Sequence, residues 1–165
     1  PGLERMMAFL DFSLIKPRLH RWKFNLKTGA TTEEDICDET IEFGVINQEI
    51  AGIEHRYTYS MIPTKGHFTF DGITKHDHKK NSISKYVFPE HIFISEVSFA
   101  QSTASNNEDD GYLITISNDV KEKTSSCLMF DAKNIEIGPI CEIPLPHQVC
   151  SGTHATWAQK SNLKT

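Results

Sequence analysis

Residues 112–117 read Tyr-Leu-Ile-Thr-Ile-Ser, an alternation that places Tyr112 and the two isoleucines on one side of an extended chain. Side chains of a β-strand alternate between its two faces, so this segment predicts a strand. A polar turn over residues 118–124 follows, and residues 126–131 bring the chain back as a second strand. The pair has the form of an antiparallel β-hairpin.

The same pattern recurs along most of the chain. Signs of helix are sparse: residues 3–10 have helical apolar spacing over only two turns, and Glu33-Glu34-Asp35 is a candidate for the start of one short turn. We therefore expect an all-β fold with few short helices. Further strands are expected at residues 19–26, 56–61, 67–77, 83–88 and 91–99.

A weak internal repeat accompanies the strands. Similar turns begin at Asn25, Asp77 and Asp131, which lie 52 and 54 residues apart. A period of about 50 residues with about four strands per unit is typical of β-propeller blades. The chain has room for two to three blades, whereas a propeller closes with about four or more. Because an open arc leaves strand edges unprotected, and because the sequence opens at Pro1 without a methionine, we expect further blades upstream.

The composition is that of an ordinary globular domain. Of 165 residues, 38% are hydrophobic and 24% charged, and the net charge is −5. No stripe of lysine and arginine is present, which argues against nucleic acid and against a membrane anchor based on positive charge. No apolar run approaches the roughly 18–20 residues that span a bilayer. Four cysteines without metal-binding spacing indicate reduced, mostly buried thiols in a cytoplasmic protein.

Two of the eight histidine contexts stand out. His76 and His78 flank Asp77 at the entrance to a lysine-rich turn, and we expect all three to be exposed turn residues. His154 lies among prolines and small residues and is followed by Trp157. Small neighbours permit close approach of the backbone to a crowded centre. From chemistry alone, His154 is either a packed histidine or a metal ligand.

Two acidic residues interrupt apolar strands. Glu42 lies between Ile41 and Phe43, and Glu96 lies within the apolar run 92–99. A carboxylate in such surroundings is costly unless it has a hydrogen-bond partner. The N–H of a metal-bound imidazole is a suitable partner, because the carboxylate orients the ring. A solvated glutamate on an edge strand is the alternative.

Several short segments bring these residues into a recognisable order. The second half of the chain contains an acidic run before the strand at 112–117 and ends on the segment around His154. The first half contains shorter pieces around Glu42. In chain order, the segments are Leu19-His20-Arg21-Trp22, Ile41-Glu42-Phe43, Asn47, His55-Arg56-Tyr57-Thr58-Tyr59, Glu108-Asp109-Asp110-Gly111-Tyr112-Leu113, Leu128-Met129-Phe130-Asp131-Ala132, Gly138-Pro139, Leu145-Pro146-His147-Gln148-Val149 and Gly152-Thr153-His154-Ala155-Thr156-Trp157.

This order resembles the C-terminal part of the carotenoid cleavage oxygenase family, from about residue 18 onward. The family includes apocarotenoid and stilbene-cleaving dioxygenases and the retinal pigment epithelium isomerase. The resemblance implies a seven-bladed β-propeller with a non-haem Fe(II) on its axis. Four histidines from different blades hold the iron, and glutamates hold three of those histidines. By resemblance, His154 is the last iron ligand, and Glu42 and Glu96 are two of the glutamates.

The resemblance also sets the expected organisation and activity. Residues 1–165 would be the C-terminal segment of one propeller domain, which needs the N-terminal blades and the other three ligands. The intact protein would use O2 to cleave a C=C bond of an apolar conjugated substrate, such as a carotenoid, an apocarotenoid or a stilbene. The chain alone would be inactive. A non-catalytic propeller scaffold, isomerohydrolase chemistry and peripheral membrane contact stay open as alternatives.

The sequence departs from the family pattern around these positions. Gly44 and Val97 follow the two glutamate motifs where proline is usual, and Ala155 follows His154 where glycine is usual. Cys150 and Thr153 replace a proline and an aromatic residue. These changes keep the metal-ligating side chains and bear on the shape of the substrate cavity.

Overall fold

The computed structural model describes residues 13–104 and 106–159, and within them the chain is all-β with two short 3-10 helices. The expected helical spacing at residues 3–10 lies outside the described residues. In chain order the elements are β1 (His20–Phe24), β2 (Thr31–Asp35), β3 (Glu42–Val45), η1 (Gln48–Ile50), β4 (Tyr57–Pro63), β5 (Phe70–Asp77), β6 (Ser82–Val87), β7 (Ile92–Ile94), β8 (Ser98–Gln101), β9 (Gly111–Asp119), β10 (Thr124–Asp131), η2 (Ile135–Ile137) and β11 (Pro139–Pro144).

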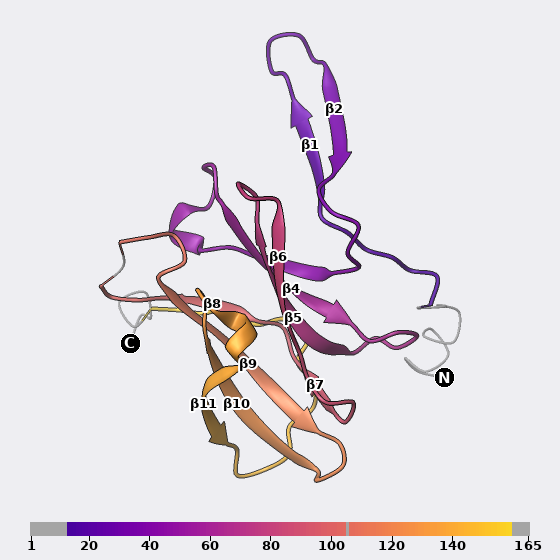
Figure 1. Ribbon diagram of the computed structural model, residues 1–165, viewed down its shortest axis with the longest axis vertical. Helices are drawn as coiled ribbons and strands as arrows, with labels where there is room; N and C mark the ends of the chain where they lie inside the picture. Colours follow the sequence, from indigo (N-terminus) through magenta and orange to yellow (C-terminus); the bar gives the residue numbers. More distant parts are fainter. Residues whose placement is uncertain (1–12, 105, 160–165) are drawn as a thin grey trace.

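The main sheet consists of two antiparallel meanders (Figure 1). In the first, β3, β4, β5 and β6 pair in sequence order. In the second, β7 and β8 pair with successive parts of β9, which pairs with β10, and β10 pairs with β11. A single pair, Phe70 opposite Ile94, joins β5 to β7. The first meander has four strands. In the second, β7 and β8 together take the place of one strand beside β9, so both meanders have the four-stranded order of a propeller blade.

The repeated turns occupy equivalent places in this architecture. The side-chain oxygens of Asn25, Asp77 and Asp131 each accept a hydrogen bond from the backbone N–H two residues on, at 2.9–3.0 Å. Such Asx turns reverse the chain locally, which explains why they were visible in the sequence. The second and third turns join the last two strands of their meanders. The same kind of turn also occurs at Asp119 between β9 and β10, where the N–H of Lys121 donates to Asp119 Oδ1 at 2.9 Å, so the turn by itself does not assign the β1–β2 hairpin to a place in a blade.

The β1–β2 hairpin projects from the rest of the chain (Figure 1). Residues 33–35, the candidate start of a short helical turn, form part of a strand that pairs with β1, so that candidate is wrong. His20 Nδ1 lies 2.7 Å from a carboxylate oxygen of Asp35 across the hairpin, and such cross-strand charge pairs favour extended pairing. Trp22 and Phe24 are 56% and 68% exposed. The hairpin thus presents a large apolar surface within the described structure.

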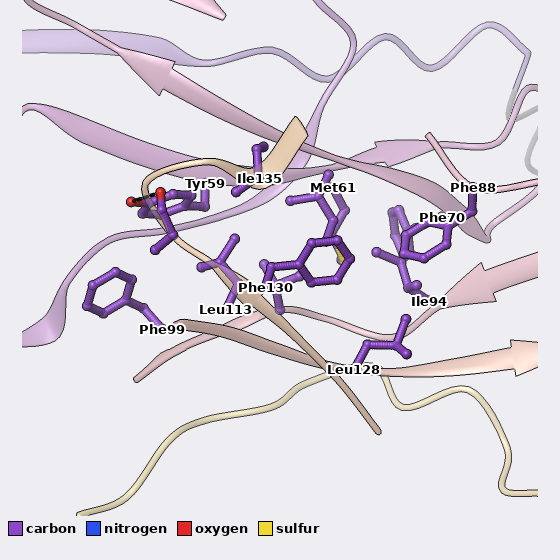
Figure 2. Packing of buried hydrophobic residues seen from close by; sticks show 13 residues of the cluster. Tyr59, Met61, Phe70, Phe88, Ile94, Phe99, Leu113, Leu128, Phe130 and Ile135 are labelled. Atoms are coloured by element: carbon purple, nitrogen blue, oxygen red, sulfur yellow. Dashed lines mark hydrogen bonds between the residues drawn. The ribbon is translucent and has the colours of Figure 1, made fainter. Parts of the chain in front are cut away.

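The core lies between the two meanders, as Figure 2 shows. On β9, Leu113 is fully buried, whereas Tyr112 is 38% exposed. The alternation predicted from the sequence is confirmed, and the side that carries Tyr112 is the more exposed one. The hydroxyl of Tyr59 donates to the backbone oxygen of Ala132 at 3.0 Å and ties β4 to the second meander. The buried cluster comprises Tyr59, Met61, Phe70, Ile73, Phe88, Ile94, Val97, Phe99, Leu113, Leu128, Phe130, Ala132 and Ile135.

The expectation that His76, Asp77 and His78 are exposed is wrong. Strand β5 continues through Asp77 as a central strand paired with β4 and β6, and His76 lines a hollow together with residues 35–39. His76 is 1% and Asp77 8% exposed. Arg56 binds the Asp77 carboxylate through two nitrogens, at 2.9 and 2.7 Å. His78 Nε2 lies 2.8 Å from the hydroxyl of Thr58. The segment fastens β4 to β5.

The burial of His78 leads to a testable pH dependence. Burial, together with nearby His76, lowers the pKa of His78 to about 4 in the folded protein, whereas an unfolded histidine titrates near 6.5. The unfolded chain therefore binds a proton as pH falls through about 6.5, and the folded chain does not until about pH 4. Stability should be lost across this window, with about 1 kcal/mol attributable to His78 at pH 5 after allowance for its partial solvent contact.

Urea unfolding at pH 7 and pH 5 tests this dependence. We expect His78→Gln to lose less stability than the wild type between the two pH values. His67 lies in an exposed loop, so His67→Gln should keep the wild-type pH dependence. Equal losses in all three proteins would contradict the assignment.

The cysteines agree only in part with expectation. All four are free, as predicted. Three are partly buried, and Cys150 is exposed on the C-terminal segment, so the expectation of mostly buried thiols is wrong. The chain needs no covalent cross-link to form these meanders.

Candidate metal-binding site

The C-terminal segment after β11 lies against the main sheet. The N–H of Leu145 donates to the backbone oxygen of Ser125 at 2.8 Å. Beyond this point the segment forms no strand in the described residues and is bound by side chains of the sheet. It carries the sequence that contains His154.

The opposing surface is formed at an interruption between two strands. One strand was expected over residues 91–99, but the structure divides it into β7 and β8. In the gap, Val97 is fully buried in the core, while Ser95 and Glu96 bond the C-terminal segment. The interruption therefore lets the polar side chains of Ser95 and Glu96 point to the C-terminal segment, while the apolar Val97 stays in the core.

Glu96 binds both the backbone and the side chain of the C-terminal segment. Its Oε2 accepts a hydrogen bond from the N–H of Ala155 at 2.6 Å. The same oxygen lies 3.4 Å from Nδ1 of His154, and the glutamate side chain is only 11% exposed. Glu96 is therefore not the solvated edge-strand residue that was the alternative.

His154 has one nitrogen next to a carboxylate and the other available. Its side chain is 74% exposed, and its ring meets Phe43 edge-on at 5.5 Å between centroids. Phe43 has a positive φ of 50°, which is unusual for a residue with a side chain. A carboxylate at Nδ1 favours the tautomer with Nε2 free to bind a metal. His154 thus fits the role of a histidine ligand, and the alternative of a packed histidine does not describe it.

Glu42 lies near this arrangement and is not part of it. It starts β3, where it pairs with Met61, and is partly buried. Its Oε2 accepts from the N–H of Phe43 at 3.3 Å, and it has no histidine partner in the described part of the chain. The structure therefore places Glu96 beside His154. Glu42 has no such contact in the described residues, but it directly precedes Phe43, whose ring contacts His154.

The described residues contain no group of three or more histidine, cysteine, aspartate and glutamate side chains able to hold a metal ion. Among them, His154 could hold a metal through Nε2, because its Nδ1 faces the Glu96 carboxylate. In residues 13–104 and 106–159 there is also no helix of the length and apolarity needed to cross a membrane.

Sequence reasoning missed two serines that bind the C-terminal segment. Ser125 Oγ accepts from the N–H of Val149, and Ser95 Oγ accepts from the N–H of Gly152, both at 3.0 Å. Serine in a strand carries no distinctive signal. The only hint was the position of Ser95 directly before the unusual Glu96.

Comparison with known families identifies the fold. The model of the family described as Retinal pigment epithelial membrane protein matches residues 4–159. The chain belongs to this family.

Its relatives include oxygenases from bacteria and plants. A carotenoid cleavage oxygenase from Mycobacterium tuberculosis is 30% identical over 149 residues, which cover 87% of this chain and 29% of that protein. A carotenoid 9,10(9',10')-cleavage dioxygenase from Phaseolus vulgaris is 27% identical, over 88% of this chain and 30% of its own length. A lignostilbene-alpha,beta-dioxygenase from Sphingomonas paucimobilis is 25% identical, over 90% of this chain and 33% of that protein. The chain spans about a third or less of the length of each of these three relatives.

Solved structures of the family have the same fold. A variant of the apocarotenoid oxygenase from Synechocystis aligns with a TM-score of 0.84 at 23% identity, over 92% of this chain and 32% of that one. The chain is therefore part of a β-propeller, and the two meanders are two of its blades.

Proposed function

We propose that this chain is the C-terminal part of an Fe(II)-dependent dioxygenase. The enzyme cleaves a C=C bond in an apolar conjugated substrate, of the carotenoid, apocarotenoid or stilbene type, to give two carbonyl products. The observation that carries the proposal is the placement of Glu96 beside Nδ1 of His154. The activities named for the relatives support the reaction class.

His154 holds the iron through Nε2 in this proposal. Histidine ligands are neutral and leave the charge of the ion uncompensated, so the Glu96 carboxylate both orients the ring and balances part of that charge. Glu42 serves a histidine from the upstream part of the protein in the same way. When bound, the iron would supply the activation of O2.

The other three ligands come from blades N-terminal to this chain, and residues 1–165 form the C-terminal segment of a single propeller domain. The β1–β2 hairpin supports this proposal, because it forms a separate two-stranded sheet with large apolar side chains exposed. The exposed Trp22 and Phe24 are then covered by the first strands of the same blade. The isolated chain, with one ligand, would not retain iron or turn over.

Iron content of the full-length protein, purified without oxygen, tests the proposal. We expect near-stoichiometric iron in the wild type and at least a 10-fold weaker affinity in His154→Ala, since even partners that only support a ligand are worth 10–100-fold. His147, exposed on the same segment, provides the matched control, and His147→Ala should keep its iron.

The other outcomes are decisive. Equal iron in the wild type and in His154→Ala would remove His154 as a ligand. No iron in any of the proteins would favour a non-catalytic propeller scaffold. For an iron-loaded protein, carbonyl products that carry oxygen from labelled O2 would support oxidative cleavage, whereas isomerised or hydrolysed product would favour isomerohydrolase chemistry.

A further inference from the structure

We propose that Ser95 and Ser125 are positioning residues that hold the C-terminal segment so that His154 faces the metal. This inference rests on the proposed function. Three N–H groups of the segment, those of Val149, Gly152 and Ala155, each donate to a side-chain oxygen of the sheet. They lie three residues apart, so the segment is fastened at regular intervals, in turn by Ser125, Ser95 and Glu96.

Apart from these bonds, the segment is held by the contact between the His154 and Phe43 rings and by a 3.3 Å hydrogen bond from Gln159 to Glu49. Backbone-to-backbone bonding to the sheet ends at Leu145 in the described residues, and residues 146–159 are exposed. Ordering an exposed backbone costs conformational entropy for every residue that is fixed. A few hydrogen bonds to rigid partners therefore decide whether the region around His154 keeps one conformation.

The two hydroxyls are rigid acceptors. Ser125 is 2% exposed and lies within β10, and its hydroxyl proton goes to Oδ1 of Asn118 at 2.8 Å, which leaves a lone pair for Val149. Ser95 is 5% exposed, and both of its backbone polar groups are bonded. Its N–H donates to the backbone oxygen of Ile116, and its backbone oxygen accepts from the Thr115 hydroxyl. Neither serine needs to reorganise to accept from the segment.

The anchors bracket the proposed ligand. Ser95 fixes Gly152, two residues before His154, and Glu96 fixes Ala155, the residue after it. Ser125 fixes Val149, which is further from His154 along the chain than Gly152 is. Loss of the Ser125 hydroxyl should therefore have a smaller effect on the position of the His154 ring than loss of the Ser95 hydroxyl. Glu96 alone cannot define the ring position, because loss of the Ser95 bond frees the chain on the near side of His154. Supporting contacts of metal ligands are worth 10–100-fold in affinity.

The test is the rate at which an Fe(II) chelator removes iron from the full-length protein. We expect Ser95→Ala to release iron 10–100-fold faster than the wild type, and Ser125→Ala to be accelerated less. Ser98→Ala and Ser126→Ala are matched controls: both serines are 8% exposed, and neither hydroxyl bonds the C-terminal segment as far as residue 159, where the described structure ends. Ser95→Thr keeps the hydroxyl and should restore most of the wild-type rate.

Hydrogen exchange at the Gly152 amide separates positioning from general destabilisation. It should accelerate in Ser95→Ala and not in Ser98→Ala, while the melting temperatures of the two variants stay similar. Equal iron release by Ser95→Ala and Ser98→Ala from a protein that binds iron would overturn this inference and leave the iron assignment intact. A wild type without iron would overturn the proposed function; unchanged exchange at Gly152 in Ser95→Ala would then overturn the anchoring as well.

Discussion

Replacing Lys75 by methionine should lower the free energy of unfolding by about 3–5 kcal/mol, because it removes one partner of a buried ion pair. The Lys75 ammonium lies 2.7 Å from Asp109 Oδ2 and 3.2 Å from the backbone oxygen of Lys133, and the two side chains are 8% and 13% exposed. It also lies 4.2 Å from the centre of the Tyr57 ring. Without the ammonium, the largely buried Asp109 carboxylate loses its ion-pair partner.

The position of this pair makes the effect global. Lys75 is on β5 of the first meander, and Asp109 precedes β9 of the second. The pair therefore links the two blades close to the hydrogen bond between Tyr59 and Ala132. Loss of the pair should weaken the contact between blades and not only one loop.

A half-exposed lysine next to it supplies the control. The Lys133 side chain is 45% exposed, and the Asp110 carboxylate that it binds also accepts hydrogen bonds from the N–H groups of Asn106 and Asn107 at 2.7 Å. Because that carboxylate keeps these partners, Lys133→Met should cost about 1 kcal/mol, less than Lys75→Met. Combining Lys75→Met with Asp109→Leu should recover much of the loss, since no lone charge remains buried. Urea unfolding of the four proteins measures these differences. Similar losses for the two lysine variants would contradict the buried-pair account.

Most strands and turns were predictable because their signals are local. The turns at Asn25, Asp77 and Asp131 are formed by side chains that bond their own backbone, so short stretches of sequence contain everything that determines them. Alternation placed Leu113 and Tyr112 on opposite faces correctly. The repeat of these local features was sufficient to indicate blades.

The errors concern contacts with distant parts of the chain. His76 lies on a strand that is paired on both sides and beside residues 35–39, which no local pattern around it reveals. The acidic residues 33–35 have helical character by themselves, and pairing with β1 overrides it. Local propensity is a weak guide wherever tertiary contacts decide.

A residue of the candidate site could be predicted only where its type is unusual for the segment around it. Glu96 attracted attention because a carboxylate is costly in an apolar strand, and the structure places it beside His154. Ser95 violates nothing, and its role follows only from the path of a segment almost 60 residues away. Glu42 shows the same apolar context as Glu96, yet has no histidine partner in the described residues.

The second large effect is expected at Gly111, where β9 begins. A methyl group there would lie 2.6 Å from the backbone oxygen of Ala100 and 2.6 Å from Cζ of Phe99. The Phe99 ring can turn, but the Ala100 oxygen belongs to β8, which pairs with β9 along its whole length. Gly111→Ala should therefore separate the two strands locally and cost about 3 kcal/mol, the upper part of the usual range for overpacking.

This substitution should also reach the metal site. β8 begins two residues after Glu96, so a shift of β8 changes the direction of the carboxylate that faces His154. Gly152→Ala is the contrasting control, because its methyl group would meet Ser95 at no less than 3.6 Å, an ordinary contact distance. We expect its stability to stay within about 0.5 kcal/mol of the wild type. Thermal unfolding and iron release on both variants separate the two effects. If Gly111→Ala unfolds earlier but releases iron at the wild-type rate, Glu96 is held independently of β8, and the anchoring of His154 does not depend on the position of that strand.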